Sequence, residues 1–393
     1  MDVSRIYIGG WFQRTSLHLA EIYDFLREKP SPLRLEEARL RAFRERLNPS
    51  GIEFHNEDFE FVVFESPVGI QTKIYEDGLI VISIDPRASM KDSVAALSEY
   101  YDEKLSPALS YLFSLGAPVP KELANIKTIY PYFVVLSNAE HSDVENIFSE
   151  FEENEHSHVE TKAFSVYRGD SLYVVNNVTE TSEHIEQLIS EQIFLREFKA
   201  QLHQYLNLHR RIWDRIALVK ERGTIMGYEI GPLRKATEGY SKTINLIETR
   251  ISQMSAYIST RESVFMSKKT LAAYANVLEY EYETLIDTHR YIKDLWVMTR
   301  NYVKSTLRYL SDLQEKSTEI SIKNLTVVSL LTAGGALISL LSRNELSLTY
   351  IGVAHVVVIG AFVYAANTII RVYYRNHVYK FNEADTIGDI EGA

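Results

Sequence analysis

The chain has 393 residues and a formal net charge of −11, and 46% of its residues are hydrophobic. This length allows two or three domains. The negative charge argues against nucleic acid as the main partner, because its phosphates would be repelled. The chain contains no cysteine, which excludes disulfides and thiolate metal sites and agrees with a reducing cytoplasm.

Residues 1–180 have the mixed pattern of an α/β domain. Asp77-Gly78 and Gly169 lie between apolar runs, which predicts two β-hairpins. The strands expected are 59–64, 70–75, 79–84, 128–136, 161–167 and 171–176, and the helices expected are 16–27, 35–46, 94–115 and 143–151. We therefore expect one sheet covered by helices. The N-terminus has no charged-then-apolar leader, so we expect residues 1–324 to remain in the cytoplasm.

Residues 181–324 read as a stalk of long helices. Apolar residues at helical spacing begin near Thr181, and this first helix should end near Gly223. Gly227, Gly231-Pro232 and Gly239 then punctuate the chain, while no Gly or Pro occurs between Tyr240 and Ala333. A break is possible near residues 267–269. Otherwise one helix can continue from the stalk into the apolar C-terminal part.

A seven-residue repeat runs along that last helix. Its positions are Leu271, Leu278, Leu285, Ile292, Leu313 and Ile320, interrupted by Thr299 and Thr306. The positions four residues later are Ala275, Tyr282, His289, Trp296, Val303 and Leu310. These are the a and d positions of a coiled coil, so the helix needs partner helices from its own chain or from other subunits.

Two apolar stretches follow, at residues 325–342 and 348–370, and His355 is the only ionisable residue in them. Each is long enough to cross a bilayer as a helix. Basic residues flank both outer ends, and aromatic residues are interleaved with those that follow the second stretch, which is typical of cytoplasmic flanks. We therefore predict a transmembrane hairpin at 325–371 and a short cytoplasmic tail at 372–393. The protein would be a multi-pass protein of the cell (inner) membrane, with both termini in the cytoplasm and the lipid bilayer as a partner.

The predicted fold class is an α+β cytoplasmic domain, a long-helix stalk with a coiled coil, and two C-terminal transmembrane helices. This order of elements resembles the CorA family of divalent-cation channels, and the segment 324–335 looks like that family's stalk-to-pore transition. The family's Gly-Met-Asn tripeptide is absent, because the matching place reads Ser342-Arg343-Asn344-Glu345. The resemblance implies transport of Mg²⁺ or a related ion through a homo-oligomeric pore, which is a pentamer in the family. The resemblance also implies that no cofactor is required and that the divalent cation is the transported ion.

Small and hydroxylated residues form one stripe on the first apolar helix. They are Ser321, Ser329, Thr332, Ala336 and Ser339, with Leu325 also on the stripe, and steps of three and four residues keep them aligned. Several copies around an axis would line an uncharged pore for a hydrated cation, since magnesium dehydrates reluctantly. The alternative is that the stripe, with Gly334-Gly335-Ala336, marks close packing between membrane helices.

The outer loop and the second apolar stretch hold four further candidates. Arg343, Asn344 and Glu345 would form rings at the outer mouth of an oligomer, where a Glu ring concentrates cations. The alternative is a simple polar loop with an Arg–Glu pair. His355 could sense protons, or it could be a neutral imidazole bonded to the first apolar helix.

An acidic segment near residue 155 could hold a regulatory cation. Its candidate ligands are Glu153, Glu155, His156 and His158, since hard cations need clustered carboxylates. The alternative is a solvated charged loop. No nucleophile with a base at suitable spacing is recognisable, so we do not expect an enzyme. The two hypotheses are a divalent-cation channel and a non-conducting, membrane-anchored coiled-coil scaffold.

Overall fold

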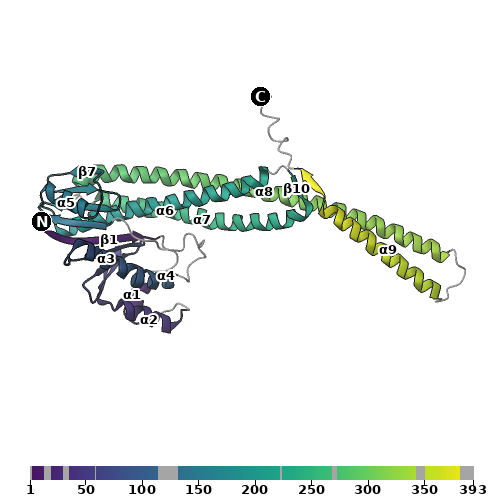
Figure 1. The fold of residues 1–393 in the computed structure, drawn as a ribbon, viewed down its shortest axis with the longest axis horizontal. Coiled ribbons are helices and arrows are strands. Elements are labelled where there is room, and N and C mark those ends of the chain that lie inside the picture. The colour runs from purple at the N-terminus through teal and green to yellow at the C-terminus, as the bar shows by residue number, and fades with distance from the viewer. Residues whose placement is uncertain are drawn as a thin grey trace, which may run out of the picture. The chain divides into compact units, whose positions relative to one another are not determined.

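The protein is described from a computed structural model, which covers residues 2–12, 19–29, 35–57, 59–113, 132–221, 224–267, 272–341 and 350–380. It is a mixed α+β chain with a large sheet and long helices, as the sequence predicts. The chain divides into two compact units, which are described separately. The first comprises Met1–Leu206 and Thr249–Lys293, and the second comprises Asn207–Glu248 and Asp294–Ala393. Figure 1 shows the elements in chain order.

The first unit is built on a nine-stranded sheet with the order β2-β3-β4-β5-β1-β6-β9-β8-β7. Neighbouring strands are antiparallel except β6 and β9, which are parallel. The strands are β1 (Val3–Trp11), β2 (Ser50–Asn56), β3 (Glu60–Glu65), β4 (Gln71–Tyr75), β5 (Leu79–Ile84), β6 (Tyr132–Ser137), β7 (Ser157–Glu160), β8 (Phe164–Arg168) and β9 (Leu172–Asn177).

Short helices cover one face of this sheet. They are α1 (Leu19–Leu26), α2 (Glu37–Leu47), α3 (Met90–Tyr100), α4 (Ser106–Phe113) and α5 (His141–Glu150), with a π-helical turn at Tyr101–Leu105 between α3 and α4. Apolar side chains from these helices form one buried cluster with alternate residues of the strands, including Ile6, Ile80 and Val134. One core of the unit therefore lies on this face, because alternate residues of a strand point the same way.

Both predicted hairpins are present. β4 pairs with β5 around Asp77-Gly78, where Gly78 has a φ of 94°. β8 pairs with β9 around residues 169–171. The sequence did not predict the central strand β1, nor β2 and β7. β1 pairs with both β5 and β6, so the strand that joins the two halves of the sheet was missed.

Three long helices follow the sheet: α6 (Ser182–Glu221), α7 (Gly227–Ser267) and α8 (Ala272–Leu341). The end of α6 and the break after Ser267 agree with the sequence. The expected punctuation at Gly231-Pro232 and Gly239 was wrong, because these residues lie inside α7. Pro232 is the sixth residue of α7, so its missing N–H removes the hydrogen bond that this position would donate to the carbonyl of Tyr228. α8 continues without a break through most of the first apolar stretch.

The heptad seam on α8 is confirmed at the positions whose side chains are described. From Leu278 to Leu313 its residues are buried, and Tyr282 and Trp296 are both 0% exposed. The two threonines do not interrupt it: Thr299 and Thr306 are buried too. Each hydroxyl donates a hydrogen bond to the carbonyl four residues earlier, at 2.8 and 2.9 Å. The polar groups are thus satisfied within the helix, which removes most of the cost of burying them.

The second unit ends in a hairpin of two helices, and the strand that follows its second helix returns to the unit. After α8, the chain returns through α9 (Tyr350–Arg375) and then forms β11 (Val378–Lys380). β11 pairs with β10 (Thr224–Met226), and Tyr379 packs on a cluster of Ile225, Ile230, Leu310 and Leu313. At about 1.5 Å per residue, α8 extends roughly 42 Å beyond Leu313, and α9 is roughly 39 Å long. The two legs of the hairpin therefore match in length (Figure 1).

Candidate functional site

The buried seam of α8 gives way to exposed apolar side chains in the C-terminal hairpin. Leu330 on α8 is 67% exposed, and Phe362 on α9 is 70% exposed. Ile322, Val357, Val358 and Ile369 are also exposed. Within the part of the chain that the structure describes, no helix combines the length and the apolarity needed to cross a membrane.

The predicted pore stripe lies on α8, since this helix includes Ser329, Thr332, Ala336 and Ser339. Ser329 is exposed, and Thr332 is half-buried with its hydroxyl donating to the carbonyl of Val328 at 2.6 Å. The side chains of Ala336 and Ser339 are outside the described set. Arg343, Asn344 and Glu345 lie outside the described residues. His355 lies in α9, and its side chain is also outside the described set.

The four predicted metal ligands near residue 155 do not converge. Glu153 accepts hydrogen bonds from the backbone N–H groups of Ser171 and Leu172, at 3.0–3.2 Å, and so braces the β8–β9 turn. His158 pairs with Glu155 at 2.8 Å, while His156 pairs with Asp170 at 3.0 Å. Across the described residues, no group of three or more His, Asp or Glu side chains is placed to hold a metal ion. The alternative of a solvated charged loop holds only in part, because His158 lies in strand β7 and Glu153 is half-buried.

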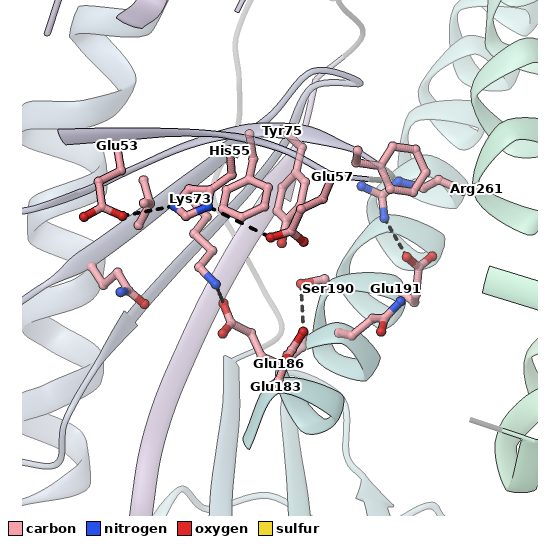
Figure 2. A pocket seen from close by; sticks show the side chains of 15 residues that line it. Glu53, His55, Glu57, Lys73, Tyr75, Glu183, Glu186, Ser190, Glu191 and Arg261 are labelled. Atoms are coloured by element: carbon pink, nitrogen blue, oxygen red, sulfur yellow. Dashed lines mark hydrogen bonds and ion pairs between the residues drawn. The ribbon is translucent and has the colours of Figure 1, made fainter. Parts of the chain in front are cut away.

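The first unit contains a cavity of about 450 Å³ between strands β2–β4 and the helices α6 and α7 (Figure 2). Phe59, Phe61 and Tyr75 form its aromatic wall. Its charged groups include five carboxylates, from Glu53, Glu57, Glu183, Glu186 and Glu191, and two permanent cations, Lys73 and Arg261. Lys73 Nζ lies 2.6 Å from Glu186 Oε1, so one of these cations is already paired at the cavity.

Arg261 lines this cavity, and its side chain is 1% exposed. Its guanidinium pairs with the carboxylate of Asp77 and, at 2.8 Å, with Glu191 Oε1. The Tyr282 hydroxyl donates to the other Glu191 oxygen at 2.5 Å. Burial raises the pKa of the Glu191 carboxyl, while Arg261 and Tyr282 oppose that rise. The cluster therefore joins the β4–β5 turn to α6, α7 and α8.

Aromatic rings complete the surroundings of Arg261. Its guanidinium carbon lies 4.8 Å from the ring centre of Phe59 and 4.7 Å from that of Phe194, which is within cation–π range. Ser190, beside the cavity, donates its hydroxyl to the carbonyl of Glu186 at 2.8 Å and is not paired with a base. The arrangement thus offers paired charges and a cation-favouring lining, but no activated nucleophile among the described residues.

The sequence contained a signal for this cluster that was not used. Arg261 falls three residues after Ile258 and four before Phe265, on the buried stripe of α7. A charged residue at an apolar-stripe position must be paired when it is buried. The partners could not be found in the same way, since Asp77 and Glu191 are distant in sequence.

Comparisons with known proteins give a limited result. No protein-family model matches the chain, and no curated protein matches it. Among solved structures, the CorA magnesium transporter from Methanocaldococcus jannaschii is similar with a TM-score of 0.29 and 10% identity, over 67% of this chain and 95% of that chain. Similarity at this level does not place individual residues, so the function is argued below from the chain itself.

Proposed function

We propose that this protein is an oligomeric membrane channel for divalent cations, such as Mg²⁺ or a related ion, with α8 lining the pore. The observation that carries the proposal is the continuity of α8. One helix runs from a buried heptad seam into an uncharged apolar stretch, and exposed apolar side chains replace the seam there. This order of elements is the one that resembles CorA-like channels.

A bilayer is the environment proposed for the hairpin. Exposed side chains such as Leu330 and Phe362 cost roughly 25 cal/mol per Å² of apolar surface in water, and lipid removes that cost. The apolar stretches at 325–342 and 348–370 would be roughly 27 and 34 Å long as helices, against a hydrocarbon core of about 30 Å. The pairing of β11 with β10 supports placing both ends of the hairpin on one side.

The proposed pore surface is the hydroxyl stripe around Ser329 and Thr332. Thr332 bonds its own helix, which leaves its oxygen able to accept a hydrogen bond from a hydrated ion. An uncharged, hydroxyl-lined pore suits a cation that keeps its water shell. Such a pore requires several copies of α8 around an axis, so the proposal includes a homo-oligomer.

Flux through reconstituted liposomes tests the proposal. We expect uptake of Mg²⁺ or Co²⁺ by the wild-type protein, and a loss of at least about tenfold in Ser329→Leu and Thr332→Leu, because both changes fill the pore with apolar bulk. Leu330→Phe is the matched control: Leu330 lies away from the stripe on the same helix, and its flux should stay near wild type. Equal flux in Ser329→Leu, Thr332→Leu and Leu330→Phe would contradict the assignment of the stripe to the pore.

The second candidate is a membrane-anchored scaffold that conducts nothing. The observation that favours it is the sequence Ser342-Arg343-Asn344-Glu345, which stands where the resembling family has Gly-Met-Asn. On this hypothesis the protein inserts and oligomerises, but no divalent cation crosses. Cross-linking in the same liposomes separates the two candidates: oligomers without flux support the scaffold.

A further inference from the structure

A second cavity in the first unit has the opposite charge to the one in Figure 2. It measures about 400 Å³ and lies between α6, α8 and the β8–β9 hairpin. Its charged lining residues are three cations and one carboxylate: Arg168, Arg196, Lys199 and Glu281. Three positive charges against one negative leave an excess of two positive charges, on a chain whose net charge is −11. A local excess of this sign favours an anionic ligand.

Arg168 is neutralised within the cavity. Its Nη2 lies 2.9 Å from Glu281 Oε1, and the amide of Gln192 donates to Glu281 Oε2 at 3.0 Å. Each oxygen of Glu281 therefore already accepts one contact, from Arg168 and from Gln192, and no ion pair joins Glu281 to the other two cations within the described residues.

Arg196 is held in place by neutral acceptors. Its guanidinium donates to the Tyr173 hydroxyl at 3.2 Å and to the backbone carbonyl of Asp170 at 2.5 Å. The Asp170 carboxylate itself pairs with His156. Burial raises the pKa of the neighbouring Glu197 to about 8, while the charge of Arg196 opposes that rise. The Arg196 guanidinium is thus fixed in position by two neutral acceptors, and within the described residues it forms no ion pair.

Lys199 follows Arg196 by three residues on α6, which places the two side chains on the same face of the helix. It is exposed, and within the described residues it forms no ion pair. A guanidinium and an ammonium at this spacing can bind one phosphate together through charge-assisted hydrogen bonds.

The α8 side of the cavity offers a flat ring and two hydroxyls. Tyr280 is 70% exposed, whereas the ring of Tyr173 already lies within 6.0 Å of both guanidinium carbons. Thr284 and Thr288 donate to carbonyls of their own helix at 2.9 and 2.8 Å, so their oxygens can still accept hydrogen bonds. An exposed aromatic ring beside a phosphate site suits a nucleobase, which stacks on such rings.

We infer that this cavity binds a nucleoside phosphate, with the phosphate between Arg196 and Lys199 and the base on Tyr280. The inference concerns the sheet-containing unit and does not depend on ion conduction. If the protein conducts, its sheet-containing unit would also bind a soluble ligand. The cation-channel hypothesis does not call for such a ligand.

Isothermal titration calorimetry on the full chain in detergent tests this inference. The probes are AMP, ATP and inorganic phosphate, and EDTA is present throughout. We expect AMP or ATP to bind, and Lys199→Gln and Tyr280→Ala each to weaken binding by about tenfold. Both residues are exposed, so these changes should not disturb folding. Lys91→Gln, at an exposed position on α3, is the matched control and should bind as wild type does.

Three results would overturn the inference. The first is no binding of AMP or ATP by the wild-type protein. The second is unchanged affinity in Lys199→Gln. The third is equal affinity for inorganic phosphate and AMP, which would remove the role of Tyr280. Flux measurements do not enter any of these readouts, so a failure here is distinct from a failure of the channel proposal.

Discussion

Among the described residues of the first unit, Arg261 is the most deeply buried charged side chain, and it pairs with two buried carboxylates. Arg261→Met would leave Asp77 and Glu191 buried without a cation. Breaking a buried ion pair in this way costs about 3–5 kcal/mol of unfolding free energy. We expect a loss of this size in urea unfolding followed by circular dichroism.

The control for this change is Arg290→Met. Arg290 pairs with Asp287 at 2.8 Å, and both side chains are exposed. Exposed pairs contribute little, so the unfolding free energy should change by less than about 1 kcal/mol. Equal losses in the two variants would show that the buried cluster does not stabilise the unit.

His289 should make stability depend on pH. Its Nε2 lies 2.5 Å from the carbonyl of Ile251, and burial, with Lys293 and Arg290 nearby, lowers its pKa. The unfolded chain then binds a proton more readily than the folded chain. Stability is therefore complete above the ordinary histidine pKa of 6.5 and is lost as the pH falls below it.

Melting temperatures measured from pH 7.5 to pH 5 test this expectation. His289→Gln keeps a donor for the Ile251 carbonyl but cannot titrate, so its melting temperature should fall less steeply with acid than that of wild type. His141→Gln, at an exposed position, should keep the wild-type slope. A His289→Gln profile that parallels wild type would exclude His289 as the titrating group.

At the scale of elements, Gly9 decides how closely α6 approaches β1. A Cβ added at Gly9 would lie 2.6 Å from the carbonyl oxygen of Ile80 and 2.7 Å from Cδ1 of Ile193. Gly9→Ala should thus destabilise the unit by about 1–3 kcal/mol through overpacking. Gly231→Ala on α7 meets nothing within 4 Å and should stabilise by about 0.5–1 kcal/mol. In thermal unfolding, we expect the melting temperature to fall for Gly9→Ala and to rise for Gly231→Ala.

These two glycines also show why elements were predicted unevenly. The hairpins at Asp77-Gly78 and Gly169 could be read locally, because turn chemistry is local. β1 could not, since its Gly9 serves packing against α6 and not a turn. Gly231 was read as a breaker, although the packing of α7 overrides the weak helix propensity of single glycines.

At the scale of the whole molecule, the return of the C-terminal strand closes the hairpin. Removing residues 376–393 deletes β11, which covers Ile225 and pairs with Thr224–Met226. We expect faster amide hydrogen exchange at Thr224–Met226 in this truncation. A truncation of residues 381–393 keeps β11 and should exchange as the full chain does. Identical exchange in both would mean that β11 does not protect β10.

The sequence by itself determined the features that depend on local periodicity: the mixed α+β class, the long helices, the heptad seam and the apolar C-terminal stretches. These follow from spacing along a few turns of chain, so no distant residue is needed to see them. Tertiary structure alone decided the strand order, the pairing of Arg261 with Asp77 and Glu191, and the cavity around Arg196 and Lys199. It also decided the docking of β11 on β10. Each of these joins residues far apart in sequence, and only the packing of the folded chain selects such partners.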